Sequence, residues 1–417
     1  MKKILFILIF INLLSYITVF ANTSNVEKPI QNENISETMQ TNKNSPIVNS
    51  KNIIVIDRKT LTPIYEKNAY EKVAMASTTK ILTCIIALEN SSKSEIVTIS
   101  KQAANVSGST LGLVKDMKIS MNDLLYGLML RSGNDCAVAI AEHISGSIDE
   151  FSKLMNTKAF ELGLCNSNFV TPHGLDNENH YTTAYDLALL TDYALKNSDF
   201  KKIVSTKKQI ISFNGYPKEI SNTNELLGNF DGIYGVKTGF TFEAGRCLVS
   251  ACSRNNFDII SVVLGADTKS IRTKDSKNII NYVYDNYKYV NVSSLIDNAF
   301  SNYIPIFNNI YHLTKTTSIP TLRLENLDNY NFPLFQGNIE NLHTKIYSLT
   351  NFNAKIYPGN IVGKISLYSN ETLLCSANIL LENKIIPNTW LFYFKKLLSI
   401  YKWWFWGRSQ KSSSKLL

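Results

Sequence analysis

The alternation of strand-like and helix-like apolar segments is the feature of this sequence that most constrains its fold. Residues 52–57 form a short apolar run typical of a central strand, and residues 61–65 form a second run after a turn. Helix-like patterns follow, and strand-like runs return at 247–252 and 258–263. Because strands flank the helices on both sides, we predict an α/β fold over residues 51–287, an antiparallel sheet covered by helices.

The predicted helices are apolar stripes with helical spacing. The first stripe begins at Ile81, just after Ser77, and serine is a residue type that favours helix starts. A second stripe over residues 124–128 ends just before residues 131–134, and a third covers residues 137–144. We therefore expect residues 131–134 to connect two buried helices.

The chain changes character outside this domain. Residues 288–387 contain short strand-like runs separated by turn residues such as Pro358-Gly359-Asn360, which predicts a small all-β domain. Residues 22–50 are rich in Asn, Ser, Thr and Glu and are expected to form a flexible spacer.

The net charge of +9 is concentrated at the two ends of the chain. Residues 1–21 combine two lysines with an apolar run and a plausible cleavage site at Val19-Phe20-Ala21, which predicts a signal peptide, the alternative being a membrane anchor. Either reading places the rest of the chain outside the cytoplasm. The body between the ends is almost neutral, which argues against a nucleic-acid partner.

The C-terminal residues 388–417 hold all four tryptophans and six basic residues, with no acid. On a helical wheel, Lys395, Lys396 and Lys402 share one face, and apolar and aromatic residues cover the other. Lysines are costly inside a bilayer, so we predict an amphipathic helix that lies on the membrane surface through residues 388–407. The alternative is a helix that packs onto the body.

The cysteines and histidines give no sign of a metal site. The five histidines lack ligand spacing with cysteines or acids, so neither a metal nor another cofactor is expected. No Cys-x-x-Cys pair occurs, and we favour buried free thiols over disulfides. The cysteines are Cys84, Cys136, Cys165, Cys247, Cys252 and Cys375.

Three short motifs carry the functional argument. They are Ser77-Thr78-Thr79-Lys80, Ser132-Gly133-Asn134 and Lys237-Thr238-Gly239, with starts 55 and 105 residues apart. Each motif is weak alone, since Ser-x-x-Lys recurs at Ser205–Lys208 and Ser-x-Asn recurs at Ser253–Asn255. Order and context distinguish the three from these repeats.

The first motif suits nucleophilic catalysis. Ser77 is a poor nucleophile until a base takes its proton, and Lys80 lies one helical turn further on the same face. Burial and a nearby cation would lower the pKa of Lys80 enough for it to act as that base. The structural alternative is that Ser77 caps the helix and Lys80 is a solvated surface lysine.

The second and third motifs suit substrate handling. The Ser132 hydroxyl can relay a proton, and the Asn134 amide can hold a substrate carbonyl. Gly239 lets an extended peptide approach a strand edge, where Lys237 and Thr238 can face its terminal carboxylate. The alternatives are a helix-capping turn for the second motif and a hairpin with a solvent-facing lysine for the third.

The ordered set of motifs resembles the penicillin-recognising serine acyltransferases. The flanking residues 123–128, 171–176 and 237–245 resemble the serine D-alanyl-D-alanine carboxypeptidases, which are low-molecular-mass penicillin-binding proteins. The resemblance is close over about 51–287 and looser beyond it, where that family also carries an all-β module. Members of the family often end in a similar membrane-associated helix.

The resemblance implies a serine acyl-enzyme mechanism. Ser77 would attack the carbonyl of the penultimate D-Ala of a peptidoglycan stem pentapeptide and release the last D-Ala. Lys80 would act as the base, and Ser132 would pass the proton to the leaving amine. β-Lactams would acylate the same serine and so inhibit the protein.

The resemblance also implies a set of substrate-binding residues. Asn134 would hold the substrate amide, Lys237 would support Ser132, and Thr238 would bind the terminal carboxylate with help from Arg272. The backbone N–H groups of Ser77 and Phe240 would form the oxyanion hole. The implied binding residues are Asn134, Lys237, Thr238, Gly239, Phe240 and Arg272.

Three other functions use the same motifs. A class A β-lactamase adds a glutamate that activates water, but the corresponding residues 165–169 contain no acid. A non-catalytic peptidoglycan-binding protein would have no need of the intact serine and lysines. Endopeptidase action on cross-links requires the same machinery, so the motifs leave it open.

Overall fold

The computed structural model describes residues 45–312, 320–327, 329–348, 356–384, 394–395 and 397–401. The predicted signal peptide, most of the predicted spacer and most of residues 388–417 lie outside the described residues. The described end of the spacer is attached to the body, because Ser50 donates through N–H and Oγ to Asp275 at 2.7 Å. Local composition gave no hint of this contact, since Asp275 is 225 residues away.

A five-stranded sheet forms the centre of the first domain, in the order β2-β1-β9-β8-β7. Every neighbouring pair is antiparallel, and β1 pairs along its whole length with β9, from Asn52 opposite Leu264 to Asp57 opposite Ile259. The predicted sheet with strands from both ends of the domain is confirmed. Its strands are β1 (Asn52–Asp57), β2 (Pro63–Lys67), β7 (Ile233–Thr241), β8 (Gly245–Arg254) and β9 (Phe257–Ala266).

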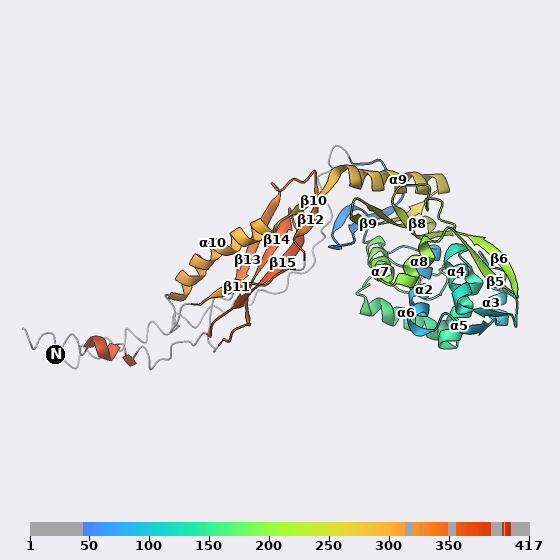
Figure 1. The fold of residues 1–417 in the computed structure, drawn as a ribbon, viewed down its shortest axis with the longest axis horizontal. Coiled ribbons are helices and arrows are strands. Elements are labelled where there is room, and N and C mark those ends of the chain that lie inside the picture. Colours follow the sequence, from blue (N-terminus) through green and yellow to red (C-terminus); the bar gives the residue numbers. More distant parts are fainter. Residues whose placement is uncertain are drawn as a thin grey trace, which may run out of the picture. The chain divides into compact units, whose positions relative to one another are not determined.

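Both faces of the sheet are covered, which explains why its strands are apolar throughout. Successive side chains point to opposite faces: Ile54 and Ile56 join the core on the side of the helical body, and Ile53 and Val55 join the core beneath α9 (Lys269–Asn286). Figure 1 shows α9 on one side of β8 and β9 and the other helices of the domain on the opposite side.

The helical body is formed by the chain between β2 and β7. Several helices begin at a hydroxyl side chain that accepts the N–H three residues later, as Ser120 does from Asp123 and Thr183 does from Asp186. The helices are η1 (Ala76–Thr79, a 3₁₀ turn), α2 (Lys80–Asn90), α3 (Lys101–Ala104), α4 (Met121–Leu130), α5 (Asn134–Ser145), α6 (Ile148–Glu161), α7 (Ala184–Lys196) and α8 (Ser198–Ser205).

Two small antiparallel pairs lie within this helical stretch. One joins β3 (Ile96–Thr98) to β4 (Lys118–Ser120), and the other joins β5 (Lys208–Phe213) to β6 (Tyr216–Ser221). A loop of residues 222–232 then leads from β6 to the edge strand β7, and this loop borders the candidate site described below.

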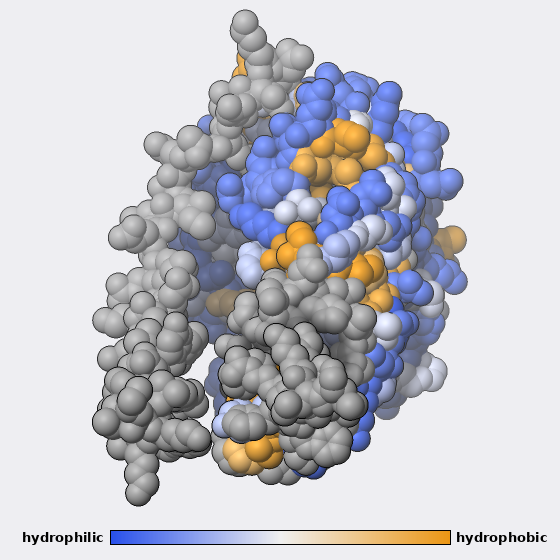
Figure 2. All heavy atoms as spheres, turned by 90° about the vertical axis from the view of Figure 1, so that its left-hand side faces the viewer, coloured by the Kyte–Doolittle hydropathy of each residue, from blue (hydrophilic) through white to orange (hydrophobic). Residues whose placement is uncertain are grey.

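The chain after α9 is rich in strands, as predicted. Its sheet has the order β11-β15-β14-β13, and β10 pairs separately with β12. Figure 2 views the whole molecule from one side. Among the coloured residues on that face, hydrophilic ones predominate and apolar ones form separate patches. The strands are β10 (Tyr287–Asn291), β11 (Leu322–Leu324), β12 (Asn331–Phe335), β13 (Leu342–Ser348), β14 (Ile361–Ser369) and β15 (Thr372–Leu381).

This region also contains a helix that the sequence did not predict, α10 (Ser293–His312). Its asparagines and the internal Pro305 are poor helix formers, which hid the pattern. The helix forms because Ile296 and Phe307 join the apolar core made by β14 and β15, so tertiary packing outweighs local propensity.

Residues 394–395 and 397–401 are helical, within the segment predicted to be an amphipathic helix. Leu397, Leu398 and Tyr401 are exposed there. In the part of the chain that the structure describes, no helix combines the length and the apolar character needed to cross a bilayer.

Candidate active site

Ser77 lies on the 3₁₀ turn η1, directly before α2. It does not cap the helix: Met75 and Thr79 hold the cap positions of η1 and α2, without side-chain capping bonds. Thr78, Thr79 and Lys80 are buried, whereas Ser77 is partly exposed. The hydroxyl of Ser77 is therefore the one in this motif that a substrate can reach.

Neighbouring side chains hold the turn before Ser77 in place. Ala76 has a φ of +50°, a left-handed conformation that is rare for a residue with a side chain. Its carbonyl accepts a hydrogen bond from Thr79 Oγ1 at 2.8 Å. His180 Nδ1 accepts the N–H of Val170, so Nε2 carries the proton and donates to Thr79 Oγ1 at 2.8 Å. These contacts support the strained conformation of Ala76.

Lys80 is completely buried, and its Nζ donates three hydrogen bonds. The acceptors are Ser77 Oγ at 2.8 Å, Asn134 Oδ1 at 2.7 Å and the His173 carbonyl at 2.7 Å. Burial, followed by the charge of Lys237, lowers the pKa of Lys80 well below its ordinary value. The structure therefore excludes a solvated surface lysine and provides an amine that can take a proton from Ser77.

Ser132 lies in the short connection between α4 and α5, as predicted. Its backbone is left-handed, with a φ of +59°, and its Oγ accepts a hydrogen bond from Lys237 Nζ at 3.0 Å. Asn134 is the first residue of α5, and its Nδ2 donates to the Ser107 carbonyl at 2.7 Å. Because Asn134 Oδ1 also contacts Lys80, this connection links the first motif to the second.

The third motif lies within β7, the edge strand of the sheet. Lys237 is buried, and its Nζ donates to Ser132 Oγ and, at 2.9 Å, to the Thr238 carbonyl. Burial and then the charge of Arg272 lower the pKa of Lys237 to about 7. The hairpin alternative required a solvent-facing Lys237, and the burial of this side chain excludes it.

Gly239 brings β7 against the turn that carries Ser77. A Cβ at this position would lie 3.1 Å from Ala76 Cβ and 3.2 Å from the backbone N of Ser77. A side chain at this position would be crowded by the turn that carries Ser77, a contact that the sequence could not indicate. The side chain of Phe240 is 41% exposed and lies beneath Arg246, whose guanidinium carbon is 3.6 Å from the ring centroid.

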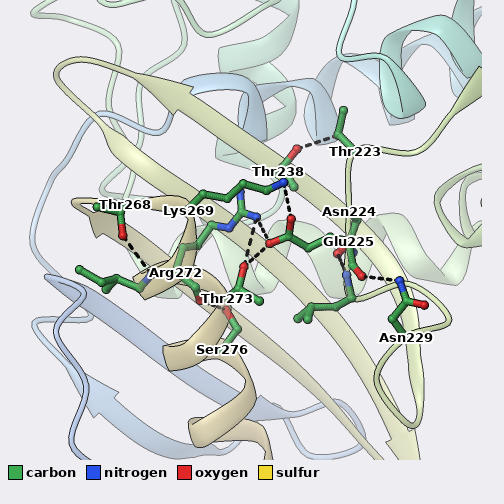
Figure 3. A network of polar contacts seen from close by, with 12 residues as sticks. Thr223, Asn224, Glu225, Asn229, Thr238, Thr268, Lys269, Arg272, Thr273 and Ser276 are labelled. Carbon is green, nitrogen blue, oxygen red and sulfur yellow. Dashed lines mark hydrogen bonds and ion pairs between the residues drawn. The ribbon is translucent and has the colours of Figure 1, made fainter.

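Thr238 and Arg272 both reach the loop that precedes β7. Thr238 Oγ1 is 2.8 Å from Thr223 Oγ1, and Arg272 Nη2 donates to Glu225 Oε1 at 2.9 Å. Figure 3 shows these contacts side by side, with Arg272 on the first turns of α9. The structure therefore brings two hydrogen-bonded groups together, Ser77 and Asn134 around Lys80 and Ser132 against Lys237, and the short connection from Ser132 to Asn134 joins them. It places Thr238 and Arg272 at the border of this cluster.

Three residues near the site were missed by the motif search. Asp135 is buried and accepts backbone N–H groups from Leu111, Gly112 and Leu113, so it anchors the loop whose Ser107 carbonyl binds Asn134. His173 acts through its carbonyl, which no side-chain motif reveals. Glu225 belongs to no motif. Of the three, only Asp135 could have been noticed in the sequence, because it directly follows Asn134.

The histidines near Ser77 are weak bases, because burial lowers both of their pKa values. Burial and the charge of Lys80 lower the pKa of His173 to about 3. Burial lowers the pKa of His180 to about 4. Both rings stay neutral between pH 5 and 8, so their roles are hydrogen bonding and packing.

The cysteines are all free, and they all lie within the described residues. Four are buried as favoured by the sequence, but Cys165 is exposed and Cys375 is partly exposed. Cys165 lies in the turn after α6, and Cys375 lies in β15 at the margin of the apolar core, placements that local hydropathy does not reveal. Among the described residues, no group of three or more His, Cys, Asp or Glu side chains could hold a metal ion.

The fold and the site together define the class of penicillin-recognising serine acyltransferases. The defining features are a serine that contacts a buried lysine, a Ser-x-Asn connection and a Lys-Thr-Gly edge strand. Within this class, the chain belongs to the D-alanyl-D-alanine carboxypeptidase family, peptidase S11, whose model matches residues 39–268, more than half of the chain.

Two relatives illustrate the similarity. D-alanyl-D-alanine carboxypeptidase DacF of Bacillus subtilis (strain 168) is 38% identical over 57% of this chain and 63% of its own length. The D-alanyl-D-alanine carboxypeptidase of Streptomyces sp. (strain K15) is 36% identical over 53% of this chain and 82% of its own length. This chain thus spans less than two thirds of the Bacillus relative.

A solved structure extends the comparison beyond the first domain. Penicillin binding protein 5 from Haemophilus influenzae has a TM-score of 0.66 and 25% sequence identity, covering 82% of this chain and 98% of that chain. The predicted order of a helix-covered α/β domain followed by a β-rich region is therefore confirmed.

Proposed function

We propose that this protein is a serine D-Ala-D-Ala carboxypeptidase that removes the terminal D-Ala from peptidoglycan stem pentapeptides. The observation that carries the proposal is the contact of 2.8 Å between Lys80 Nζ and Ser77 Oγ. Lys80 is fully buried and its pKa is lowered, so the amine can be neutral and accept the serine proton.

Acylation begins at Ser77. Its Oγ attacks the carbonyl carbon of the penultimate D-Ala while its proton passes to Lys80 Nζ, and the resulting oxyanion is bound by the N–H groups of Ser77 and Phe240. The peptide bond then breaks, and the leaving amine takes a proton through the Ser132 hydroxyl. Water hydrolyses the ester and regenerates Ser77.

The other motif residues hold the substrate and supply charge. Asn134 binds the substrate amide, and Lys237, 3.0 Å from Ser132 Oγ, favours delivery of the proton by that hydroxyl. Thr238 and Arg272 bind the terminal carboxylate, and Gly239 leaves the edge of β7 open to the peptide backbone. Penicillin uses the same groups: its ring opens on Ser77 and leaves an ester that water reaches slowly.

The test is the intact mass of the full chain over time with benzylpenicillin, together with an assay of D-Ala release from a stem pentapeptide. A persistent one-to-one adduct with D-Ala release supports the proposal. Rapid drug turnover through a transient adduct would identify a β-lactamase. Hydrolysis of cross-linked dimers without release of terminal D-Ala would identify an endopeptidase, and folded protein with neither adduct nor turnover would indicate a binding protein.

We further propose that the protein is exported and is held at the outer face of the cytoplasmic membrane by residues 388–407. The exposed apolar side chains Leu397, Leu398 and Tyr401 support surface attachment, and the lysines of this segment favour anionic headgroups.

Deleting residues 388–417 should release the protein from anionic lipid vesicles without changing the rate of penicillin acylation. A second variant replaces Leu397, Leu398 and Tyr401 with serine and keeps every lysine, so it tests the apolar side chains separately from the charge. This variant should also stay in solution. A truncated protein that still sediments with vesicles would refute the attachment.

A further inference from the structure

A cluster of positive charge borders the proposed carboxylate-binding groups. Lys237 and Arg272 interact electrostatically, and so do Arg272 and Arg246. Lys269 lies on the same turn of α9 as Arg272 and shares an acidic partner with it. Cations held this close repel one another, so the protein needs a compensating anion when no substrate is bound.

Glu225 provides that anion. Its Oε1 accepts hydrogen bonds from Arg272 Nη2 at 2.9 Å and from the Thr273 hydroxyl, and its Oε2 pairs with Lys269 Nζ at 2.5 Å. Partial burial opposes ionisation, but the bonds to Lys269 and Thr273 and the charge of Arg272 prevail and lower the pKa of Glu225. Figure 3 shows its carboxylate enclosed by these three side chains.

The same loop touches both groups assigned to the substrate carboxylate. Thr223, two residues before Glu225, is hydrogen-bonded to Thr238 across 2.8 Å. Between them, Asn224 is buried and fixes the loop by accepting the N–H of Leu226. Glu225 therefore reaches Arg272 from a loop whose position is set next to β7.

Arg272 has hydrogen-bonding capacity left over. Its side chain is only 4% exposed, and its Nε has no hydrogen-bond partner among the residues that the structure describes. A buried guanidinium N–H without a partner is costly, and a second carboxylate that reorients the guanidinium would satisfy it. Glu225, with a side chain that is 30% exposed, can move aside more easily than Arg272.

We propose that Glu225 is a specificity-determining residue: it is an internal carboxylate that holds Arg272 until the terminal carboxylate of a substrate replaces it. The identity of that substrate carboxylate rests on the proposed function. Glu225 keeps the cation cluster ordered in the free protein, and its charge weakens the binding of any ligand that ends in a carboxylate. Ligands without a terminal negative charge do not experience this competition.

The test compares Glu225→Gln with the wild-type full chain on two peptides, an acylated D-Ala-D-Ala with a free carboxylate and the same peptide with a terminal amide. We expect KM for the acid to fall about five- to tenfold, with kcat within about twofold, because one repulsive charge near the site is worth about 1 kcal/mol. KM for the amide should not change.

Two further variants separate competition from mere positioning. Glu225→Asp keeps the charge and should restore a KM close to that of the wild type. Glu219→Gln makes the same substitution in β6, at an exposed residue paired with Lys208, and should change nothing. A raised KM for the acid in Glu225→Gln, or equal changes for acid and amide, would overturn the proposal.

A separate readout keeps this inference distinct from the proposed function. The rise in melting temperature that each peptide causes reports binding whether or not the peptide is cleaved. If the wild type binds the acid peptide but cleaves nothing, the carboxypeptidase proposal fails. The Glu225 proposal is then decided by whether Glu225→Gln enlarges the shift for the acid and not for the amide.

Discussion

The helix-covered sheet domain and the strand-rich region after α9 differ in what they bury. In the described part of the chain, the buried polar and charged side chains lie before residue 288, with the single exception of Ser366. The first domain buries Lys80, Lys237, Asp135 and Arg272 around one site. The second region packs α10 against its sheet through apolar contacts.

This difference places the candidate catalytic groups in the first domain, whereas the second region is held together by apolar packing. Burying a lysine opposes its charge and destabilises the folded protein, so such groups are retained where an altered pKa or a fixed donor is useful. The sheet of the second region needs only apolar burial to be stable. We therefore expect substitutions of buried polar groups to affect acylation in the first domain and only stability in the second.

The largest expected effect is that of Ser77→Ala. Without the nucleophile, the penicillin adduct should disappear and D-Ala release should fall by at least about 10³-fold, as for other serine enzymes that lose this group. Intact mass spectrometry and a D-Ala assay measure both. Ser205→Ala, which alters the same Ser-x-x-Lys spacing at the end of α8, is the matched control and should behave as wild type. An adduct that persists in Ser77→Ala would show that Ser77 is not the acylated residue.

The pH dependence of acylation tests Lys237. Its pKa is about 7, so the ammonium that donates to Ser132 is lost above that pH, and acylation should fall about tenfold per pH unit on the alkaline side. His173 and His180 titrate near 3 and 4 and do not contribute there. Lys237→Arg keeps its charge and should be about tenfold slower at neutral pH but flat across this range.

Raising the pH, which should slow acylation through Lys237, should stabilise the folded protein through the same side chain. The folded pKa of Lys237 lies below its ordinary value of 10.5, so protonation opposes folding. Its contribution to the free energy of unfolding therefore increases as the pH rises from about 7 towards 10.5. Denaturant unfolding of wild type and Lys237→Met across this range measures the contribution. A difference between the two that is independent of pH would contradict the lowered pKa.

A smaller effect is expected for Asp135→Asn. The amide cannot accept all the N–H groups of the loop at residues 111–113, so the free energy of unfolding should fall by about 1–3 kcal/mol. Because this loop leads back to the Ser107 carbonyl that binds Asn134, acylation should slow by up to about tenfold. Asp116→Asn, at a side chain that is 75% exposed, is the control and should do neither.

The smallest effect is expected for Ser366→Ala in the second region. Ser366 Oγ lies 2.9 Å from Ser376 Oγ, and loss of this bond should cost about 1 kcal/mol or less of unfolding free energy. Penicillin acylation should stay within twofold of wild type. Slower acylation in this variant would show that the two regions are coupled and that the contrast between them is incomplete.

Much of the fold could be predicted from local pattern. The strand-like runs at residues 52–57, 247–252 and 258–263 and the helical stripes between them give the helix-covered sheet, because apolar periodicity reports which faces are buried. The helix α10 escaped prediction because its asparagines and Pro305 conceal a helix that packing alone stabilises. The contact of Ser50 with Asp275 escaped because it joins residues far apart in sequence.

For the site, the three motifs, their order and the residue types that suit acyl transfer could be read directly from the sequence. The three-dimensional fold was needed to show that Lys80 is buried against Ser77, that Lys237 reaches Ser132 from the edge strand, and that Gly239 lies close to the turn that carries Ser77. It also decided that Glu225 faces Arg272. The physical reason is that burial, pKa and charge pairing depend on distances in space, and separation along the chain does not encode those distances.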